Sequence, residues 1–196
     1  MDKGGNLIKS KWFGTYDEPP VRQQNDRFIV SWDSALSAKD LASYSVGIVL
    51  QVRGDEIYVL DAVRERLEYP DLKRRVIELH KRWNIGSRYA LLIENKGSGM
   101  ALIQELKRDN KIYAQEVDPQ GDKVVRMHAQ TARMEARGIF LPRQAHWLDE
   151  FRKEILSFPS SRHNDQVDAF SQGLDEAYNP QRRGESAQGF AIGLLY

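Results

Sequence analysis

The feature that most constrains the fold is a run of three β-forming segments near the start of the chain. Residues 27–33 (RFIVSWD), 44–53 (YSVGIVLQVR) and 56–65 (EIYVLDAVRE) are rich in β-branched and aromatic side chains. Only Gly54 and Asp55 separate the second segment from the third, which is a strong signal for a β-hairpin. The sequence therefore predicts three consecutive antiparallel strands.

The rest of the chain alternates strands with helices. Residues 89–95 (YALLIEN) are a continuous apolar run ending at Glu94 and Asn95, which is typical of a buried parallel strand. Shorter strands are predicted at 112–119 and 138–142, and amphipathic helices at 69–84, 99–110, 121–137, 146–158 and 164–178. This order predicts an α/β fold: an RNase H-like mixed sheet of five or more strands, in which three antiparallel strands precede parallel β-α units, with helices on both faces.

Length and composition limit the domain organisation and the partners. The 196 residues suffice for one domain, predicted at 27–178, between a Gly- and Pro-containing linker or arm at 1–26 and a flexible tail at 179–196. A net charge of +1 argues against a uniformly basic nucleic-acid binder but permits a local basic face. The sequence has no cysteine, so any metal must be held by oxygen or imidazole ligands. No apolar run is long enough to span a membrane.

Acidic residues stand at the ends of two predicted strands and at the start of the last helix. Asp33 ends the first strand, Glu94 ends the fourth, and Asp165 and Asp168 open the helix. In a mixed sheet of this order the first and fourth strands can be neighbours, so their carboxyl ends would lie side by side. Clustered carboxylates repel one another, and a divalent cation removes that conflict. The pattern suits Mg²⁺ or Mn²⁺, and two such ions can hydrolyse a phosphodiester.

Each acidic residue also has a structural interpretation. Asp33 could cap a turn after its strand, whereas Glu94, which follows four apolar residues, is poorly placed for ordinary solvation. Asp165 could merely complement the helix dipole, and Asp168, one turn later, lies on the same flank of the helix. Asp40 is either an auxiliary residue near the metal or a helix cap.

Taken together, these motifs resemble the C-terminal nuclease domain of a tailed-bacteriophage terminase large subunit. The stretches that carry the resemblance are VSWDSALSAKDLASYSVGIV, LLIENKGSG, GDKVVRMHAQTARMEARGIFLP and HNDQVDAFSQ, in the family's order, within residues 5–178. One position departs from the family pattern, which often has two adjacent aspartates where this chain has Asn164 followed by Asp165. The resemblance therefore favours Asp165 as the third metal ligand, with Asp168 as the competing assignment.

The resemblance implies a specific activity and specific partners. Such a domain cuts concatemeric viral double-stranded DNA during genome packaging, in the host cell cytoplasm, with Mg²⁺ or Mn²⁺ and little sequence preference. Its implied partners are an ATPase motor domain, the portal protein and the small terminase subunit, and no membrane is involved. Residues 1–26 resemble the segment that joins the motor domain to the nuclease domain. The chain lacks the phosphate-binding motif of such a motor.

The resemblance also extends to individual residues. Asp33 would bridge two ions, while Glu94 and Asp165 would each hold one. His163 and Asn164 are auxiliary candidates, and the candidates for DNA contact are Lys96, Lys123 and Arg126. These three cations could equally be solvated surface residues.

Two other functions remain open from the sequence. Another RNase H-like nuclease, such as a junction resolvase or a transposase core, would share the carboxylates and differ in substrate. Alternatively, the chain could be a non-catalytic docking module of a packaging motor, in which the acidic residues are structural.

Overall fold

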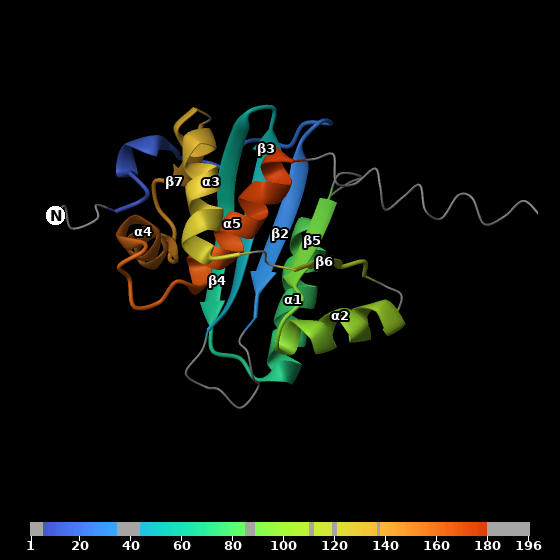
Figure 1. Ribbon diagram of the computed structural model, residues 1–196. Helices are drawn as coiled ribbons and strands as arrows, with labels where there is room; N and C mark the ends of the chain where they lie inside the picture. Colours follow the sequence, from blue (N-terminus) through green and yellow to red (C-terminus); the bar gives the residue numbers. More distant parts are fainter. Residues whose placement is uncertain are drawn as a thin grey trace, which may run out of the picture.

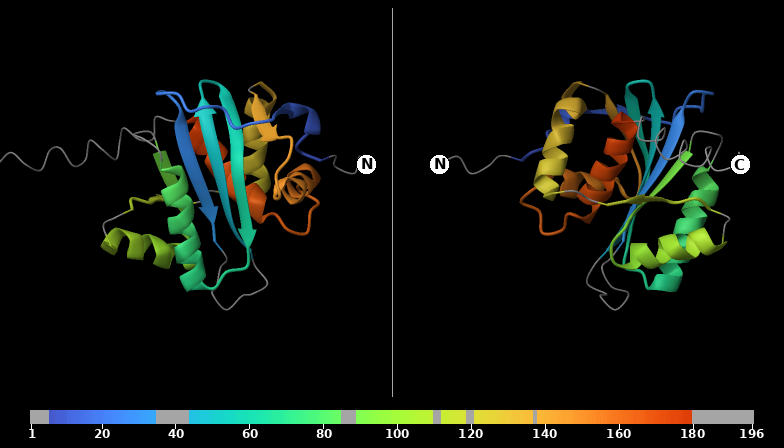
Figure 2. Two further views of the ribbon diagram at one scale, coloured as in Figure 1. Left: turned by 180° about the vertical axis from the view of Figure 1, so that it is seen from behind. Right: turned by 45° about the vertical axis from the view of Figure 1, so that its right-hand side comes forward.

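The computed structural model describes residues 6–34, 44–84, 89–109, 112–118, 121–136 and 138–179, which form a seven-stranded sheet with helices on both faces (Figures 1 and 2). The strands are β1 (Phe13–Tyr16), β2 (Arg27–Asp33), β3 (Ser45–Arg53), β4 (Glu56–Glu65), β5 (Tyr89–Glu94), β6 (Gln115–Val117) and β7 (Ile139–Pro142). The helices are a 3₁₀ turn (Ser10–Trp12), α1 (Tyr69–Trp83), α2 (Ser98–Asp109), α3 (Lys123–Ala136), α4 (Leu148–Ser157) and α5 (Asp165–Tyr178). None of the helices among the described residues has the length and apolar character needed to cross a membrane.

The order of strands in the sheet is β1-β7-β4-β3-β2-β5-β6. β2, β3 and β4 pair antiparallel, as the hairpin signal predicts. β5 pairs parallel with β2, and β6 pairs parallel with β5. On the other side, β7 is parallel to β4 and β1 is parallel to β7. The predicted RNase H-like mixed sheet is therefore confirmed, and the first and fourth predicted strands are neighbours.

The sequence analysis misses one strand and overextends another. Residues 1–26 are predicted to contain no strand, yet Phe13–Tyr16 forms β1 at the edge of the sheet. This strand is only four residues long, contains a glycine and is only partly buried, so it carries no clear periodic pattern. The strand predicted at 112–119 is reduced to Gln115–Val117. Whether 1–26 joins an upstream domain stays a prediction.

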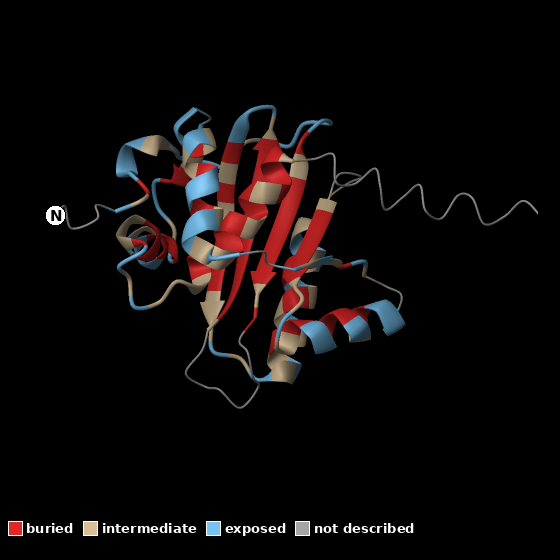
Figure 3. Ribbon diagram, viewed as in Figure 1, coloured by how far each residue is buried: buried red, intermediate tan, exposed pale blue. Residues whose placement is uncertain are grey.

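Two hydrophobic cores hold the helices against opposite faces of the sheet. α3, α4 and α5 cover one face, while α1 and α2 cover the other (Figure 2). β2, β3 and β5 are buried except at end residues, whereas the outward faces of α2 and α3 are exposed (Figure 3). α5 is joined to β2 by a buried hydrogen bond of 2.7 Å, which the Ser31 hydroxyl donates to the carbonyl of Ala169. This contact fixes α5 across the middle of the sheet.

Candidate active site at the carboxyl edge of the sheet

Asp33 and Glu94 lie side by side where two neighbouring parallel strands end. Asp33 is the last residue of β2 and Glu94 the last residue of β5. The register pairs Trp32 with Ile93, so the next position on each strand places the two carboxylates together. Since side chains alternate along a strand, Asp33 is on the same face as Ser31, which is the face that α5 covers. The predicted juxtaposition of these two acids is therefore present in the structure.

The Asp33 carboxyl group is in an environment that disfavours its charge. Burial raises the pKa of Asp33 well above its ordinary value, and the hydrogen bond with Glu94 raises it further. The negative charge of Glu94 adds to the same effect, followed by the smaller contributions of Asp168 and Asp165. A proton on Asp33 would relieve this unfavourable environment, and so would a cation placed between the two carboxyl groups.

The first turn of α2 packs directly against the end of β5. A Cβ atom on Gly99 would lie 2.1 Å from the carbonyl oxygen of Glu94 and 3.0 Å from the hydroxyl of Ser34. Only glycine fits there, because the first of these distances is far below van der Waals contact. The helix therefore fixes the backbone at the point where Glu94 leaves the strand.

Asp165 is the first residue of α5 and belongs to the same group of charges. Burial raises its pKa, while the positive charge of Arg64 acts in the opposite direction. Smaller lowering effects on the Asp165 pKa come from His163 and Lys123. Because Asp165 also raises the pKa of Asp33, the α5 terminus and the end of β2 are electrostatically coupled.

Asp168 is held by two cations from α3. Lys123 Nζ donates to Asp168 Oδ2 at 2.7 Å, and Arg126 donates to Asp168 Oδ1 at 2.7 Å. We call these three residues the α3–α5 clasp. Both carboxylate oxygens of Asp168 therefore bind cations, which distinguishes this residue from Asp165. The two residues predicted to contact DNA, Lys123 and Arg126, thus lie beside the predicted metal ligands.

The remaining predicted residues surround this cluster. His163 is half-buried, and its ring meets that of Tyr44 edge-on with centroids 5.7 Å apart. Asn164 stands at the N-cap of α5, where it accepts a hydrogen bond from Ser161 and makes no capping bond of its own. Lys96 is exposed, two residues after Glu94. Asp40 and the tail beyond residue 179 lie outside the described residues.

The donor set suits a divalent cation, but it is not arranged as a finished coordination sphere. Within the described ranges, no group of three or more histidine, aspartate or glutamate side chains is placed to hold a metal ion. The acids are instead engaged pairwise, Asp33 with Glu94 and Asp168 with its two cations. Hard carboxylate oxygens are the ligands that Mg²⁺ and Mn²⁺ prefer. A proton on the Asp33 carboxyl group, whose pKa is raised, would compete with an ion at this edge.

The sequence analysis misses a cation on the same row of the sheet. The register pairs Asp33 with Val46, and Val46 with Arg64, so Arg64 lies two strands from Asp33 on the same face. Its side chain is only 13% exposed and interacts with two acids of α4, Glu150 at 3.6 Å and Glu154 at 3.4 Å. In the sequence, the one sign of this role is that a charged residue stands near the end of a predicted strand, at a position whose side chain faces the core.

Glu154 is a second missed residue, and it organises the start of α5. One Glu154 oxygen accepts a 2.7 Å hydrogen bond from the Gln166 backbone N–H, and the other accepts a 2.8 Å bond from the Gln166 side chain. Glu154 is buried, and this burial raises its pKa, which the bonds from Gln166 partly offset. Its sequence signal is an acid in the apolar stripe formed by Phe151, Ile155 and Phe158.

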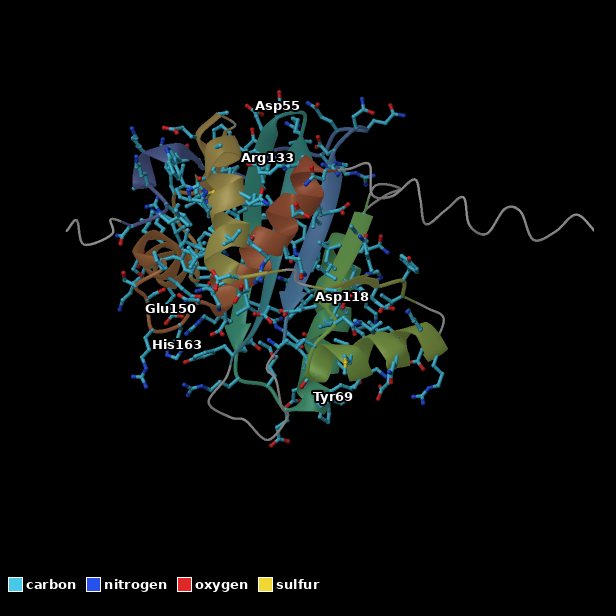
Figure 4. All side chains as sticks on the ribbon, viewed as in Figure 1. Asp55, Tyr69, Asp118, Arg133, Glu150 and His163 are labelled. Atoms are coloured by element: carbon cyan, nitrogen blue, oxygen red, sulfur yellow. The ribbon has the colours of Figure 1, made fainter. Side chains whose placement is uncertain are left out.

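A third missed acid lies at the same edge of the sheet. Asp118 follows β6 and accepts a 3.0 Å hydrogen bond from the side chain of Asn95. Figure 4 labels it on the β5–β6 side of this edge, with His163 and Glu150 on the other side. Its signal is a predicted strand that ends in a carboxylate, as the strands before Asp33 and Glu94 do.

Replacement of Glu154 is expected to loosen the start of α5. Glu154→Leu should lower the free energy of unfolding by about 2–3 kcal/mol, since it leaves the buried Gln166 N–H without its acceptor and removes the nearer of the two acids that pair with Arg64. Glu154→Gln keeps an acceptor oxygen and should lower it by less. Chemical denaturation of the two variants measures the difference. An equal loss in both, or no loss, would contradict this role.

The fold and its acidic edge define an RNase H-like α/β domain. The chain belongs to the family described as the terminase RNaseH-like domain, whose sequence model matches residues 30–177. No curated protein sequence matches it significantly.

Solved structures of phage terminases share the fold. The large terminase nuclease of thermophilic phage G20c with bound magnesium aligns with a TM-score of 0.58 at 14% identity, over 84% of this chain and 92% of that one. The nuclease domain of Thermus phage P74-26 aligns with a TM-score of 0.59 at 12% identity, over 85% of this chain and 92% of that one. A large terminase from another thermophilic bacteriophage gives 0.61 at 10% identity, and the match covers 86% of this chain but only 43% of that protein.

Proposed function

We propose that this chain is a metal-dependent endonuclease that cuts concatemeric viral DNA during genome packaging, with little sequence preference. The observation that carries the proposal is the contact between Asp33 and Glu94 at the ends of two parallel strands, beneath the first turn of α5. Membership of the terminase RNaseH-like family supports it. The G20c nuclease structures with bound magnesium, zinc or cobalt support a divalent metal for this chain as well.

In this proposal Asp33, Glu94 and Asp165 hold two ions, Mg²⁺ or Mn²⁺. Divalent ions at such a site supply activation of the attacking water and stabilisation of the leaving oxygen. Asp33 lies beside Glu94 and is coupled to Asp165, so it is suited to bridge the two positions. Because burial and Glu94 raise the pKa of Asp33, a proton on Asp33 would compete with the cation, so metal binding should weaken as the pH falls.

The α3–α5 clasp supplies the DNA contacts. Lys123 and Arg126 are both partly exposed, so a phosphate group can reach them while Asp168 holds them in place. Lys96 provides a further exposed charge beside Glu94. Contacts to phosphates give affinity without reading the base sequence, which agrees with cleavage at many sites.

The large terminase that is matched over only 43% of its length is much longer than this chain. We therefore propose that the chain acts together with an ATPase motor domain, and that the portal protein and the small terminase subunit are partners of the whole assembly. The same large terminase has been solved in complex with ADP, which supports a nucleotide-binding part outside the region matched here. The proposed place of action is the host cell cytoplasm.

The choice of substrate tests this function against its rivals. The chain should cut a linear duplex in Mn²⁺ at many positions, and a four-way junction of the same sequence no faster, because phosphate contacts do not depend on junction geometry. Gel analysis of end-labelled substrates gives both rates. Glu94→Gln is the matched control and should cut neither substrate.

The two contrary results point to different functions. A strong preference for the junction would contradict packaging and favour a resolvase. Folded protein that cuts neither substrate in Mn²⁺ or Mg²⁺ would contradict catalysis and favour a docking module.

A further inference from the structure

Two arginines share one aromatic ring at the ends of β3 and β4. Tyr44 immediately precedes β3 and Arg66 follows β4. The guanidinium carbon of Arg64 lies 3.5 Å from the centroid of the Tyr44 ring, and that of Arg66 lies 4.5 Å from it. We call these residues the Tyr44 stack. Arginine planes on an aromatic ring are attracted by its quadrupole and lose part of their rotational freedom.

The two arginines of the stack differ in their counter-charges. Arg64 is mostly buried and interacts with both Glu150 and Glu154. Arg66 is exposed, and among the residues that the structure describes no acid forms an ion pair with it. Arg64 is therefore neutralised and fixed, whereas Arg66 presents to solvent an oriented guanidinium that no acid of the described residues neutralises.

The stack lies next to the carboxylate edge. The Tyr44 ring touches that of His163, two residues before Asp165. Arg64 lies opposite Asp33 across β3, so the Cα atoms of the two residues are about 10 Å apart, which is two strand spacings. Arg66, two residues further along, is therefore about 12 Å from Asp33. The structure thus places an exposed positive charge near a cluster of negative ones.

We propose that Arg66, held on the Tyr44 ring, binds a backbone phosphate of duplex DNA adjacent to the phosphate that is cleaved. This inference rests on the proposed nuclease function and names a substrate contact on the β3–β4 side of the carboxylates, opposite to Lys96. A planar guanidinium with its donors free can bind a phosphate through two parallel hydrogen bonds.

The test is the salt dependence of DNA binding. Fluorescence anisotropy with a short labelled duplex, in Ca²⁺ to suppress cleavage, gives the dissociation constant at several salt concentrations. Arg66→Gln should weaken binding several-fold and reduce the slope of log affinity against log salt by about 0.9, the value for one lost phosphate contact. Arg22→Gln removes an equally exposed arginine before β2, near the opposite end of the sheet, and should change neither quantity.

The ring of Tyr44 gives a second, independent comparison. Tyr44→Phe keeps the aromatic face and should bind DNA like the wild type, whereas Tyr44→Leu should reproduce the loss seen with Arg66→Gln. Wild-type affinity and slope in Arg66→Gln would overturn the proposal and leave the nuclease function intact. If the wild-type chain itself neither bound nor cut duplex DNA, the nuclease function would fail and this contact with it.

Discussion

Asp33→Asn is expected to reduce metal-dependent DNA cleavage more than roughly 100-fold while leaving the fold intact. Changes in residues that only support metal ligands typically cost about 10–100-fold, so the loss of a proposed bridging ligand should exceed that range. The substitution keeps the size of the side chain and removes its charge. Initial rates of plasmid nicking in Mn²⁺, with circular dichroism to confirm the fold, measure the effect.

The same variant should be more stable than the wild type when metal is absent. The raised pKa of Asp33 means that the native state binds its proton more tightly than the unfolded chain does. The free energy of unfolding therefore falls as the pH rises from about 4 through the native pKa. The neutral amide of the variant would carry no such penalty, so thermal unfolding in EDTA should favour the variant at pH 8 and show no advantage near pH 3.

Added metal should make the wild type more stable than Asp33→Asn. Mn²⁺ should raise the melting temperature of the wild type and have little effect on Asp33→Asn, since a ligand that binds only the native state stabilises it. A wild-type protein that is already the more stable one in EDTA at pH 8, or a variant with undiminished cleavage, would contradict the assignment of Asp33.

Asp165→Asn and Asp168→Asn are expected to have different effects. Asp165→Asn should reduce cleavage more than roughly 100-fold with little change in stability, as expected for a metal ligand. Asp168→Asn should keep the metal-induced rise in melting temperature, because its oxygens are bound to Lys123 and Arg126. It should instead lower the free energy of unfolding by about 1–2 kcal/mol and weaken DNA binding, because the clasp is broken.

Asp55→Asn is a suitable control for this pair. Asp55 is exposed in the β3–β4 turn at the opposite end of the sheet (Figure 4), so its replacement should leave cleavage unchanged. Loss of metal-induced stabilisation in Asp168→Asn but not in Asp165→Asn would exchange the two assignments.

The elements that the sequence predicts well are those with a strong local pattern. The three antiparallel strands begin and end within one residue of their predicted limits, because runs of β-branched side chains and the turn at Gly54 and Asp55 specify them locally. The proximity of Asp33 and Glu94 follows from strand order alone. β1 could not be predicted in the same way, because its four residues are a strand only by pairing with β7, more than 120 residues later.

The charge partners in the site depend on long-range packing. Glu154 reaches Arg64 across 90 positions of the chain, and its place in an apolar stripe does not indicate which cation it meets. In the same way, Asp168 meets Lys123 and Arg126 only when α3 and α5 pack side by side. The sequence therefore predicts which acids gather at the edge of the sheet, while the structure shows which of them are already neutralised.

The central claim is that the carboxylate edge cleaves DNA with a divalent metal, and plasmid cleavage by the wild-type chain and by Glu94→Gln, in Mn²⁺, Mg²⁺ and EDTA, tests it most directly. The account predicts nicked and linear products from the wild type in Mn²⁺ or Mg²⁺, none in EDTA, and none from Glu94→Gln in any condition. Cleavage that persists in EDTA or in Glu94→Gln, or a folded wild type that cuts in neither metal, would contradict it.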